Sequence, residues 1–382
     1  MKRVGNLYNC INNINVIMNM YDRVISVNTK NKSKIEKFND YYSCNIINIK
    51  NIINSNDYKP NRYNIFFIRE PKLRIIMSQN ITDKVINHLV AKYFLIDIFE
   101  NSFIDTNVAT RVNRGTHYGI RKVKKYLNEI KYKNENFYYL KFDISKYFYN
   151  IDHEIAKNLI RNKIKNQKVL KVLDDIIDST NASYVNKIIS DFKQNEIERI
   201  RGLKISDKEK QIKISEVSKI PLYEFGKGLP IGNMTSQIIA ILYLNELDHF
   251  IKEKLHIKYY CRYMDDGLLI HNDKEYLKYC LDEILKIINK YNLTLNIKKT
   301  RIDGIKQGID FLGYRFLIKN NKVIMKVRND CKKRFKKKLK RLDAELDKKE
   351  LSYDEYLNEF AGYYGHLKWG NCRNLLNLIN KK

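Results

Sequence analysis

Two adjacent carboxylates between apolar strand-like segments constrain this chain more than any other feature. Asp265 and Asp266 lie within IKYYCRYMDDGLLI, residues 257–270, which predicts a strand, a tight turn and a second strand. Aspartate is common in turns, but one such residue would serve a turn alone. Two adjacent carboxylates repel each other, and the flanking apolar residues place them at the edge of a buried sheet. The pair therefore indicates a polar site at the end of a strand hairpin.

A third aspartate ends another predicted strand. FYYLKFDISKYF, residues 137–148, alternates so that Lys141 and Asp143 fall on one face of the strand. If Asp143 meets Asp265 and Asp266, the three carboxylates need a cation to neutralise them. Oxygen ligands suit Mg²⁺, and two such ions about 4 Å apart serve phosphoryl transfer by activating an attacking oxygen and stabilising a leaving one.

The charge of the chain favours a polyanionic partner. The 382 residues include 72 Lys and Arg against 43 Asp and Glu, which gives a formal net charge of +29. This is more than solubility requires, and nucleic acid is the first candidate for the partner. A coding bias toward Lys and Asn raises the lysine content, but it does not explain the excess of basic over acidic residues.

The cysteines and the apolar runs favour a cytoplasmic protein. The six cysteines are scattered, without a CxxC pair or a histidine at zinc spacing. Asn interrupts the N-terminal apolar run too often for a signal peptide. No run approaches the ~20 apolar residues of a membrane helix. We therefore expect a cytoplasmic protein with no membrane partner.

The order of predicted elements favours an α+β fold. Residues 61–80 predict a hairpin with EPK at its turn, and residues 81–99 predict a helix that Thr82 caps. Residues 191–218 are highly charged and aperiodic, which predicts an exposed insertion or a mobile connection. Because strands and helices alternate without a regular βαβ rhythm, we expect one mainly antiparallel sheet backed by helices. Further helices are predicted over residues 114–130, 152–200, 235–253, 277–293 and in the basic C-terminal region.

A loop rich in glycine and proline is the third candidate site. GKGLPIGNMTSQ, residues 226–237, leads directly into an apolar helix. Glycine in such a loop lets another group approach the backbone closely. Ile231 nevertheless places an apolar side chain in the middle of this loop, which a simple polar turn does not explain.

Taken in order, these motifs resemble those of reverse transcriptases. YMDD resembles the catalytic turn, KFDISKYFYNID the first aspartate motif, GLPIGNMTSQ the substrate-binding loop, EPKLRII the fingers motif and FLGY (311–314) the primer-grip hairpin. A lone YxDD is weak, but the ordered set over roughly residues 61–370 is specific. The resemblance implies a right-hand polymerase with fingers, a palm of antiparallel sheet backed by helices, and a small helical thumb. We expect an N-terminal extension over residues 1–60, fingers and palm over 61–317, and a basic thumb over 318–382.

The resemblance implies that this chain is an RNA-directed DNA polymerase, a nucleotidyltransferase that copies template RNA into cDNA. The primer 3′-hydroxyl would attack the α-phosphate of a dNTP and release pyrophosphate, with two Mg²⁺ ions as cofactor and Mn²⁺ as a substitute. The metal ligands would be Asp143, the carbonyl of Ile144, Asp265 and Asp266, of which Asp266 is expected to act at longer range. Lys299 would protonate the leaving pyrophosphate. A pure RNA-binding protein would not need the three aspartates, and a metal nuclease would not need Phe148 or the fingers hairpin.

The resemblance also implies a nucleotide site. Arg74 would grip the triphosphate, because guanidinium suits bidentate phosphate contacts. Lys72 or, alternatively, Arg69 would add a second charge. Phe148 would be the steric gate that excludes a ribose 2′-hydroxyl, with Tyr147 as the neighbouring competitor. The other expected nucleotide-binding residues are Ser145, Lys146, Ile231, Gly232 and Gln237.

The primer and template are expected on the catalytic turn, the FLGY hairpin and the basic C-terminal helix. CKKRFKKKLKR, residues 331–341, has eight basic residues in eleven, while Phe335, Leu339 and Leu342 repeat at helical spacing. One face therefore packs, and the other carries charges that would repel without nearby phosphates. The expected contacts are Tyr263, Met264, Phe311, Leu312, Gly313, Lys332, Lys333, Arg334, Lys336 and Lys337.

The loop resembles that of one branch of the family. Where many relatives have Gln at the position of Ile231 and Pro at that of Gln237, this chain reads IGNMTSQ, as diversity-generating retroelements do. The resemblance implies error-prone copying opposite template adenine, together with a small basic accessory protein, in a bacterial, archaeal or phage-encoded system. An apolar side chain under the forming base pair removes hydrogen bonds that report correct geometry. Defence-associated (anti-phage) reverse transcriptases of bacteria share parts of these motifs and are the alternative.

Overall fold

The computed structural model describes residues 11–28, 31–55, 58–69, 73–133, 135–370 and 372. It combines helices with antiparallel strands, which confirms the predicted α+β class. The described strands form three sheets, ordered β1-β2, β4-β5-β3-β6 and β7-β8-β9, rather than the single sheet expected from the sequence. Among the described strands, neither the first nor the third sheet shares a strand with the second.

The chain divides into two compact units, each built from three separated segments. The first comprises Met1–Asp105, Ile144–Phe250 and Ile284–Leu295, and the second comprises Thr106–Asp143, Ile251–Glu283 and Asn296–Lys382. Within the described residues, no helix combines the length and the apolar character needed to cross a membrane.

The first unit contains the predicted hairpin, formed by β1 (Asn64–Ile68) and β2 (Arg74–Ser78). One residue in two is buried along both strands, so the hairpin has an inner and an outer face. Its inner residues share a core with α10 (Ser183–Arg201). The other helices of this unit are α1 (Ile14–Asn28), α2 (Lys32–Asn39), α3 (Tyr42–Ser55), α4 (Ile81–Val90), α5 (Asp97–Phe99), α7 (Tyr147–Asn150), α8 (His153–Arg161), α9 (Gln167–Ile177), α11 (Asp207–Ser218), α12 (Met234–Tyr243) and α13 (Asn245–His249).

The predicted cap of α4 is wrong by two residues. Asn80, rather than Thr82, is the N-cap, and its side chain accepts a hydrogen bond from the backbone N–H of Asp83 at 2.7 Å. Asparagine is among the preferred N-cap residues, and the helix begins directly after it at Ile81. The helix continues as a π-helical segment, η2 (Ala91–Ile96).

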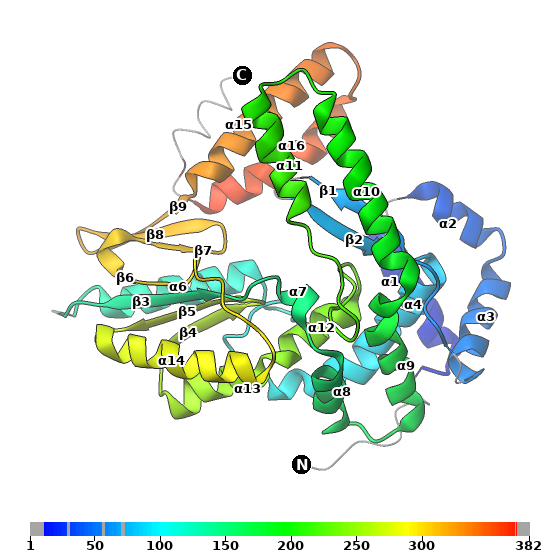
Figure 1. Cartoon of the computed structure of the whole chain (residues 1–382), viewed down its shortest axis with the longest axis horizontal. Coiled ribbons are helices and arrows are strands. Elements are labelled where there is room, and N and C mark those ends of the chain that lie inside the picture. The colour runs from blue at the N-terminus through cyan, green and yellow to red at the C-terminus, as the bar shows by residue number, and fades with distance from the viewer. Residues whose placement is uncertain are drawn as a thin grey trace. The chain divides into compact units, whose positions relative to one another are not determined.

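Residues 191–218 are not an irregular or mobile connection, as one reading of their charge predicted. They form the second half of α10, a short turn and α11 (Figure 1). Ser206 and Glu209 make a reciprocal capping box at the start of α11, a local signal for a helix start. Lys193 on α10 donates to the carbonyl of Ser218, the last residue of α11, at 3.2 Å and joins the two helices. Few positions are apolar, and so the helical period is weak in the sequence.

The second unit contains the sheet that carries the aspartates, formed by β3 (Tyr138–Asp143), β4 (Tyr259–Tyr263), β5 (Asp266–His271) and β6 (Arg301–Gly304). The predicted basic helix α6 (Thr116–Ile130) packs its apolar face against this sheet (Figure 1). The strand-turn-strand over residues 257–270 is confirmed. Helix α14 (Lys274–Lys290) follows β5, as its amphipathic pattern predicted.

The C-terminal part of this unit contains a three-stranded sheet and two helices. The strands are β7 (Ile309–Phe311), β8 (Tyr314–Lys319) and β9 (Lys322–Val327), and the helices are α15 (Asn329–Asp347) and α16 (Tyr353–Trp369). The predicted apolar face of α15 is confirmed, because Phe335 and Leu342 are buried. Phe335 meets Tyr363 of α16, with ring centroids 5.4 Å apart. The rings of Trp369 and His117 of α6 stack with centroids 3.9 Å apart, and Trp369 packs against the core of this unit.

Candidate active site

The catalytic-turn motif forms a two-residue turn between β4 and β5. Tyr263 pairs with Asp266, which leaves Met264 and Asp265 at the turn. Met264 has a φ of 54°, a left-handed conformation that is disfavoured for residues with a side chain. The fully buried Arg262 stabilises it, since its Nη1 donates to the Met264 carbonyl at 2.7 Å. The buried guanidinium of Arg262 thus holds the backbone of this turn through a hydrogen bond to the Met264 carbonyl.

The strand register brings the three predicted aspartates together. β3 and β5 are antiparallel, and Asp143 is the direct partner of Asp266. Residues directly opposite each other in such a pair have Cα atoms about 4.5–5.5 Å apart. Asp265 is next to Asp266 in the turn, so all three carboxylates lie at one end of the sheet. Ile144, the proposed carbonyl ligand, follows Asp143 directly and forms an isolated bridge with Leu295.

Two lysines neutralise two of these carboxylates. Lys299, which the sequence predicted as a site residue, places its Nζ 2.7 Å from both carboxylate oxygens of Asp143. Lys141 places its Nζ 3.0 Å from Oδ2 of Asp266 and also donates to the carbonyl of Asp310 at 2.9 Å. Lys141 is not among the site residues that the sequence predicts. The signal was present, because Lys141 precedes Asp143 by two residues and shares its face of β3.

Asp266 is in an unfavourable environment for a carboxylate. Its pKa is raised to about 6, above all by burial, and the charges of Asp265 and Asp143 contribute to this rise while Lys141 opposes it. Its buried Oδ1 has no hydrogen-bond partner in the described structure. A hard cation bound by oxygen would relieve both conditions, so the residues fit a divalent ion. As placed, no three acidic, His or Cys side chains of the described residues are grouped closely enough to share one ion.

In the first unit, the glycine-rich loop lies against β2 of the hairpin. The backbone N–H of Met77 donates to the carbonyl of Ile231 at 2.8 Å. Gly232 has a φ of 134°, and a Cβ added to it would lie 2.7 Å from the carbonyl oxygen of Met77. The close approach that this glycine allows is therefore to the chain's own backbone. Ile231 is half-buried and Gln237 lies in α12, also half-buried.

Phe148 and Tyr147 differ in their surroundings. Tyr147 is buried, and its hydroxyl donates to the carbonyl of Ala240 in α12. Phe148 is half-buried, and its carbonyl accepts a hydrogen bond from the N–H of Leu229 in the loop at 2.8 Å. The ring of Phe148 thus remains partly accessible next to the loop, whereas that of Tyr147 belongs to the core. The preceding Lys146 is exposed and has a φ of 47°, and Ser145 N–H donates to the Thr294 carbonyl at 2.8 Å.

The basic residues of the hairpin have different positions. Arg74 is exposed at the start of β2, opposite Ile68 of β1. Arg69, the alternative second charge, forms two hydrogen bonds with Glu196 of α10. Lys72 lies outside the described residues.

The predicted primer-grip motif forms the turn between β7 and β8. Phe311 pairs with Tyr314, and the two turn residues Leu312 and Gly313 have φ values of 50° and 84°, the signature of a type I′ hairpin. A Cβ on Gly119 of α6 would lie 2.6 Å from Cδ1 of Leu312, so the turn packs tightly on that helix.

The basic run of α15 has more acidic neighbours than expected. Arg334 pairs with Asp330 at 3.2 Å, Arg341 with Glu345 at 3.1 Å, and Lys338 with Glu359 of α16. These partners are outside the run itself, so the local pattern did not show all of them. Within the described residues, no ion pair involves four cations of the predicted nucleic-acid face, which are Lys332, Lys333, Lys336 and Lys337.

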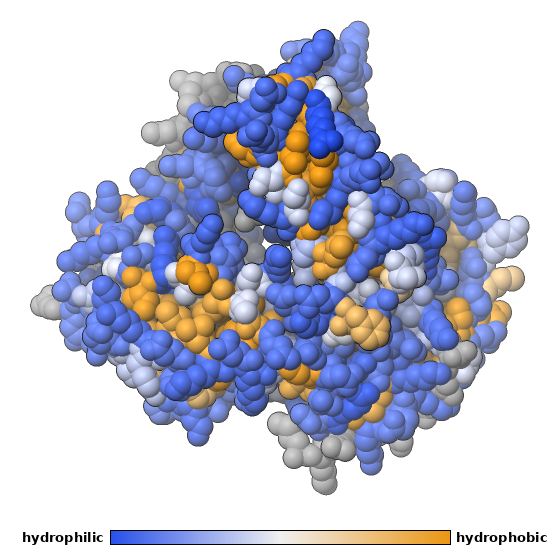
Figure 2. Space-filling model, viewed as in Figure 1, coloured by the Kyte–Doolittle hydropathy of each residue, from blue (hydrophilic) through white to orange (hydrophobic). Residues whose placement is uncertain are grey.

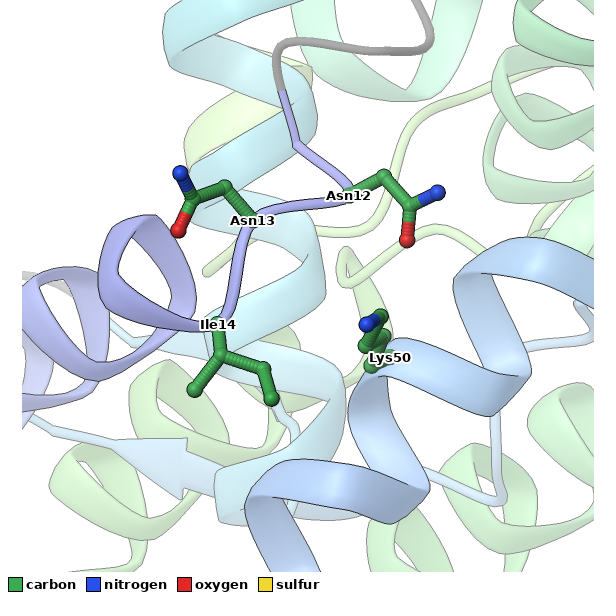
Figure 3. A pocket seen from close by; sticks show the side chains of 4 residues that line it. All are labelled: Asn12, Asn13, Ile14 and Lys50. Carbon is green, nitrogen blue, oxygen red and sulfur yellow. The ribbon is translucent and has the colours of Figure 1, made fainter.

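A shallow pocket elsewhere in the chain does not resemble an active site. It is lined by Asn12, Asn13 and Ile14 at the start of α1 and by Lys50 of α3 (Figure 3). Asn12 accepts a hydrogen bond from Asn54 at 3.0 Å. These residues provide no acid, base or nucleophile in a catalytic arrangement.

Comparison with known proteins agrees with this geometry. Residues 59–316 match the family described as reverse transcriptase (RNA-dependent DNA polymerase). The chain belongs to this family of nucleotidyltransferases. The chain is also similar to Protein YkfC of Escherichia coli (strain K12), with 20% identity over 284 residues. That match covers 66% of this chain and 65% of the length of the relative.

Proposed function

We propose that this chain synthesises cDNA on an RNA template by nucleotidyl transfer at Asp143, Asp265 and Asp266. The observation that carries the proposal is the register of β3 and β5, which sets Asp143 opposite Asp266 in a chain of the reverse transcriptase family. These aspartates and the carbonyl of Ile144 would hold Mg²⁺, or Mn²⁺ as a chemically suitable substitute, which would neutralise charge on the attacking and leaving oxygens.

The protein's own residues perform the remaining tasks. Arg262 keeps the turn in the conformation that presents Asp265 and Asp266. Lys299 carries its ammonium group 2.7 Å from Asp143, and in this proposal it donates a proton to the leaving pyrophosphate. Arg74 binds the triphosphate, and Ser145, Lys146, Phe148 and the loop through Gly232 and Gln237 bind the nucleotide. Tyr263, Met264, the Phe311–Gly313 turn and the basic face of α15 bind primer and template.

Primer extension on an RNA template with dNTPs and Mg²⁺ tests this function. We expect Asp265→Asn to lower the rate at least 100-fold, because a carboxylate that balances the metal charge becomes a neutral amide. Asp282→Asn is the matched control, since Asp282 is an exposed acid on α14. Extension by Asp265→Asn at the rate of the control would contradict the assignment.

We further propose that the copying is error-prone, as in a diversity-generating retroelement with a small basic accessory protein. The half-buried Ile231 offers no hydrogen bond to a nucleotide from its side chain, which supports reduced discrimination between right and wrong pairs. The defence-associated (anti-phage) role is the alternative for the same polymerase, and a cytoplasmic bacterial, archaeal or phage-encoded setting suits both.

Replacing Ile231 by Gln tests the error-prone proposal. We expect misincorporation opposite template adenine to fall about tenfold. The added amide can donate hydrogen bonds to acceptor groups of a correctly placed base pair, which stabilises correct pairs over wrong ones. Sequencing of cDNA made by each variant measures the error spectrum. Leu222→Gln, a similar change at an exposed position before the loop, should leave that spectrum as it is. Equal spectra for wild type and Ile231→Gln would reject the role of Ile231 and favour the alternative.

A further inference from the structure

The helical insertion carries a buried carboxylate that its charged sequence does not single out. The side chain of Glu196 on α10 is only 6% exposed, while its neighbour Glu198 is exposed. A buried charge is stable only when it is paired and hydrogen-bonded. The hydrogen-bond partners of Glu196 therefore indicate the structural role of this buried carboxylate.

Glu196 joins its own helix to the end of the hairpin. Arg69 donates from Nε at 3.2 Å and from Nη2 at 2.7 Å, and Arg199 donates from Nε and Nη2 at 2.8 Å each. Each carboxylate oxygen thus accepts one bond from each arginine. These hydrogen bonds lower the pKa of Glu196 to about 2, so the group is ionised at neutral pH. Arg199 is three residues away, but Arg69 is 127 residues away.

We call the Arg69–Glu196–Arg199 group the clamp. The apolar contacts around it also connect β1 and α10. The rings of Phe67 on β1 and Phe192 on α10 stack with centroids 3.8 Å apart. A cavity of about 390 Å³ lies beside the clamp, and its apolar lining comes from Leu73, Ile200 and Val217. Figure 2 shows hydrophobic residues gathered between α10 and α11 in the same region. The rest of the cavity lining is charged and includes Arg69, Glu196 and Arg199, so the clamp forms part of the cavity wall.

The clamp lies on the inner face of the hairpin, and Arg74 lies on the outer face. Phe67 is buried against α10, and Arg69, directly after the end of β1, reaches Glu196 on the same helix. Ile68, between them, pairs with Arg74, and both are exposed. Holding Arg69 therefore fixes the strand end that presents Arg74 without occupying Arg74 itself.

We propose that Glu196 is a positioning residue for nucleotide capture, because its clamp on Arg69 orients the hairpin end that carries Arg74. This inference rests on the proposed role of Arg74 in binding the triphosphate. The α10–α11 segment is then an internal support of the nucleotide-binding hairpin. The sequence of residues 191–218 predicted only an exposed insertion or a mobile connection.

Variants of the full chain test the clamp by two readouts. The first is KM for dNTP and kcat in primer extension, and the second is hydrogen–deuterium exchange of the amides in residues 64–78. We expect Glu196→Gln and Arg69→Gln each to raise KM about tenfold, because each breaks the same charge-assisted bonds. The double variant should be no worse than either single variant, since the two changes remove one interaction. kcat should stay within about twofold, and exchange in β1 and β2 should rise.

Glu198→Gln is the matched control, because Glu198 is exposed on the same helix two residues further on. It should leave both readouts as in wild type. If Glu196→Gln does not fold, Arg69→Gln alone decides, since Arg69 is half-exposed: faster exchange confined to residues 64–78 supports the clamp, and unchanged exchange overturns it.

Two results would overturn the inference. One is unchanged exchange and unchanged KM in Glu196→Gln. The other is a raised KM in Arg69→Gln only, with additive effects in the double variant, which would make Arg69 a direct phosphate contact. Arg74→Gln separates this inference from the proposed function. If that variant keeps the wild-type KM, the role of Arg74 fails, whereas the exchange data still report on the clamp.

Discussion

At the scale of the residue, burial separates two aromatic neighbours that the sequence left as competitors. Tyr147 has its ring in the core and its hydroxyl bonded to Ala240, so it has no surface left for a substrate. Phe148 is half-buried and is anchored through its backbone to Leu229 of the glycine-rich loop. Only Phe148 therefore suits the proposed role of a gate against the ribose 2′-hydroxyl.

The gate is tested by Phe148→Ala. We expect the preference for dNTP over NTP to fall by up to about 100-fold, since an apolar pocket rejects an added hydroxyl by roughly that factor. Steady-state incorporation of matched dNTP and NTP measures this ratio. Tyr147→Phe keeps the ring and loses only the bond to Ala240, so its selectivity should equal that of wild type. An unaltered ratio in Phe148→Ala would mean that another group reads the sugar.

At the scale of the element, α15 shows how tertiary partners divide a uniformly basic run. Arg334, Lys338 and Arg341 are compensated by acids of α15 and α16. Lys332, Lys333, Lys336 and Lys337 therefore account for most of the uncompensated charge on this helix. Because phosphate contacts release counterions, such charges dominate the salt dependence of nucleic-acid binding.

Replacing Lys332, Lys333, Lys336 and Lys337 together by Gln tests this division. Each phosphate contact adds roughly −0.7 to −0.9 to the slope of log K against log salt, so we expect the slope to become less negative by about 3. Affinity for a primer–template duplex measured over a salt series gives this slope. The control is Lys338→Gln with Arg341→Gln, whose charges already have acidic partners and which should change the slope less. If both variants changed the slope equally per replaced residue, the ion pairs would have no effect on which cations contact phosphate.

At the scale of the whole molecule, the aspartates could be predicted from the sequence because strand alternation and turn chemistry are local properties. The apolar residues around Asp265 and Asp266 specify a hairpin, and those before Asp143 specify a strand that ends there. Both hairpins of the predicted motifs, over residues 61–80 and 311–314, are confirmed for the same reason. Lys299 places its Nζ 2.7 Å from Asp143, and its role in catalysis stays a prediction.

Other features depended on the tertiary structure, because they join residues far apart in the chain or choose between locally similar options. Asn80 and Thr82 are both suitable caps, and only the packed start of α4 selects Asn80. The pairing of Lys141 with Asp266 requires the β3–β5 register. The insertion at 191–218 appeared as a featureless charged segment, because its structural role depends on Glu196 meeting Arg69 across 127 residues. The sequence by itself thus determined that Asp143, Asp265 and Asp266 stand at the ends of strands. Only the tertiary structure decided that Lys141 pairs with Asp266 and that Glu196 pairs with Arg69, since an ion pair between distant residues leaves no periodic pattern in the sequence.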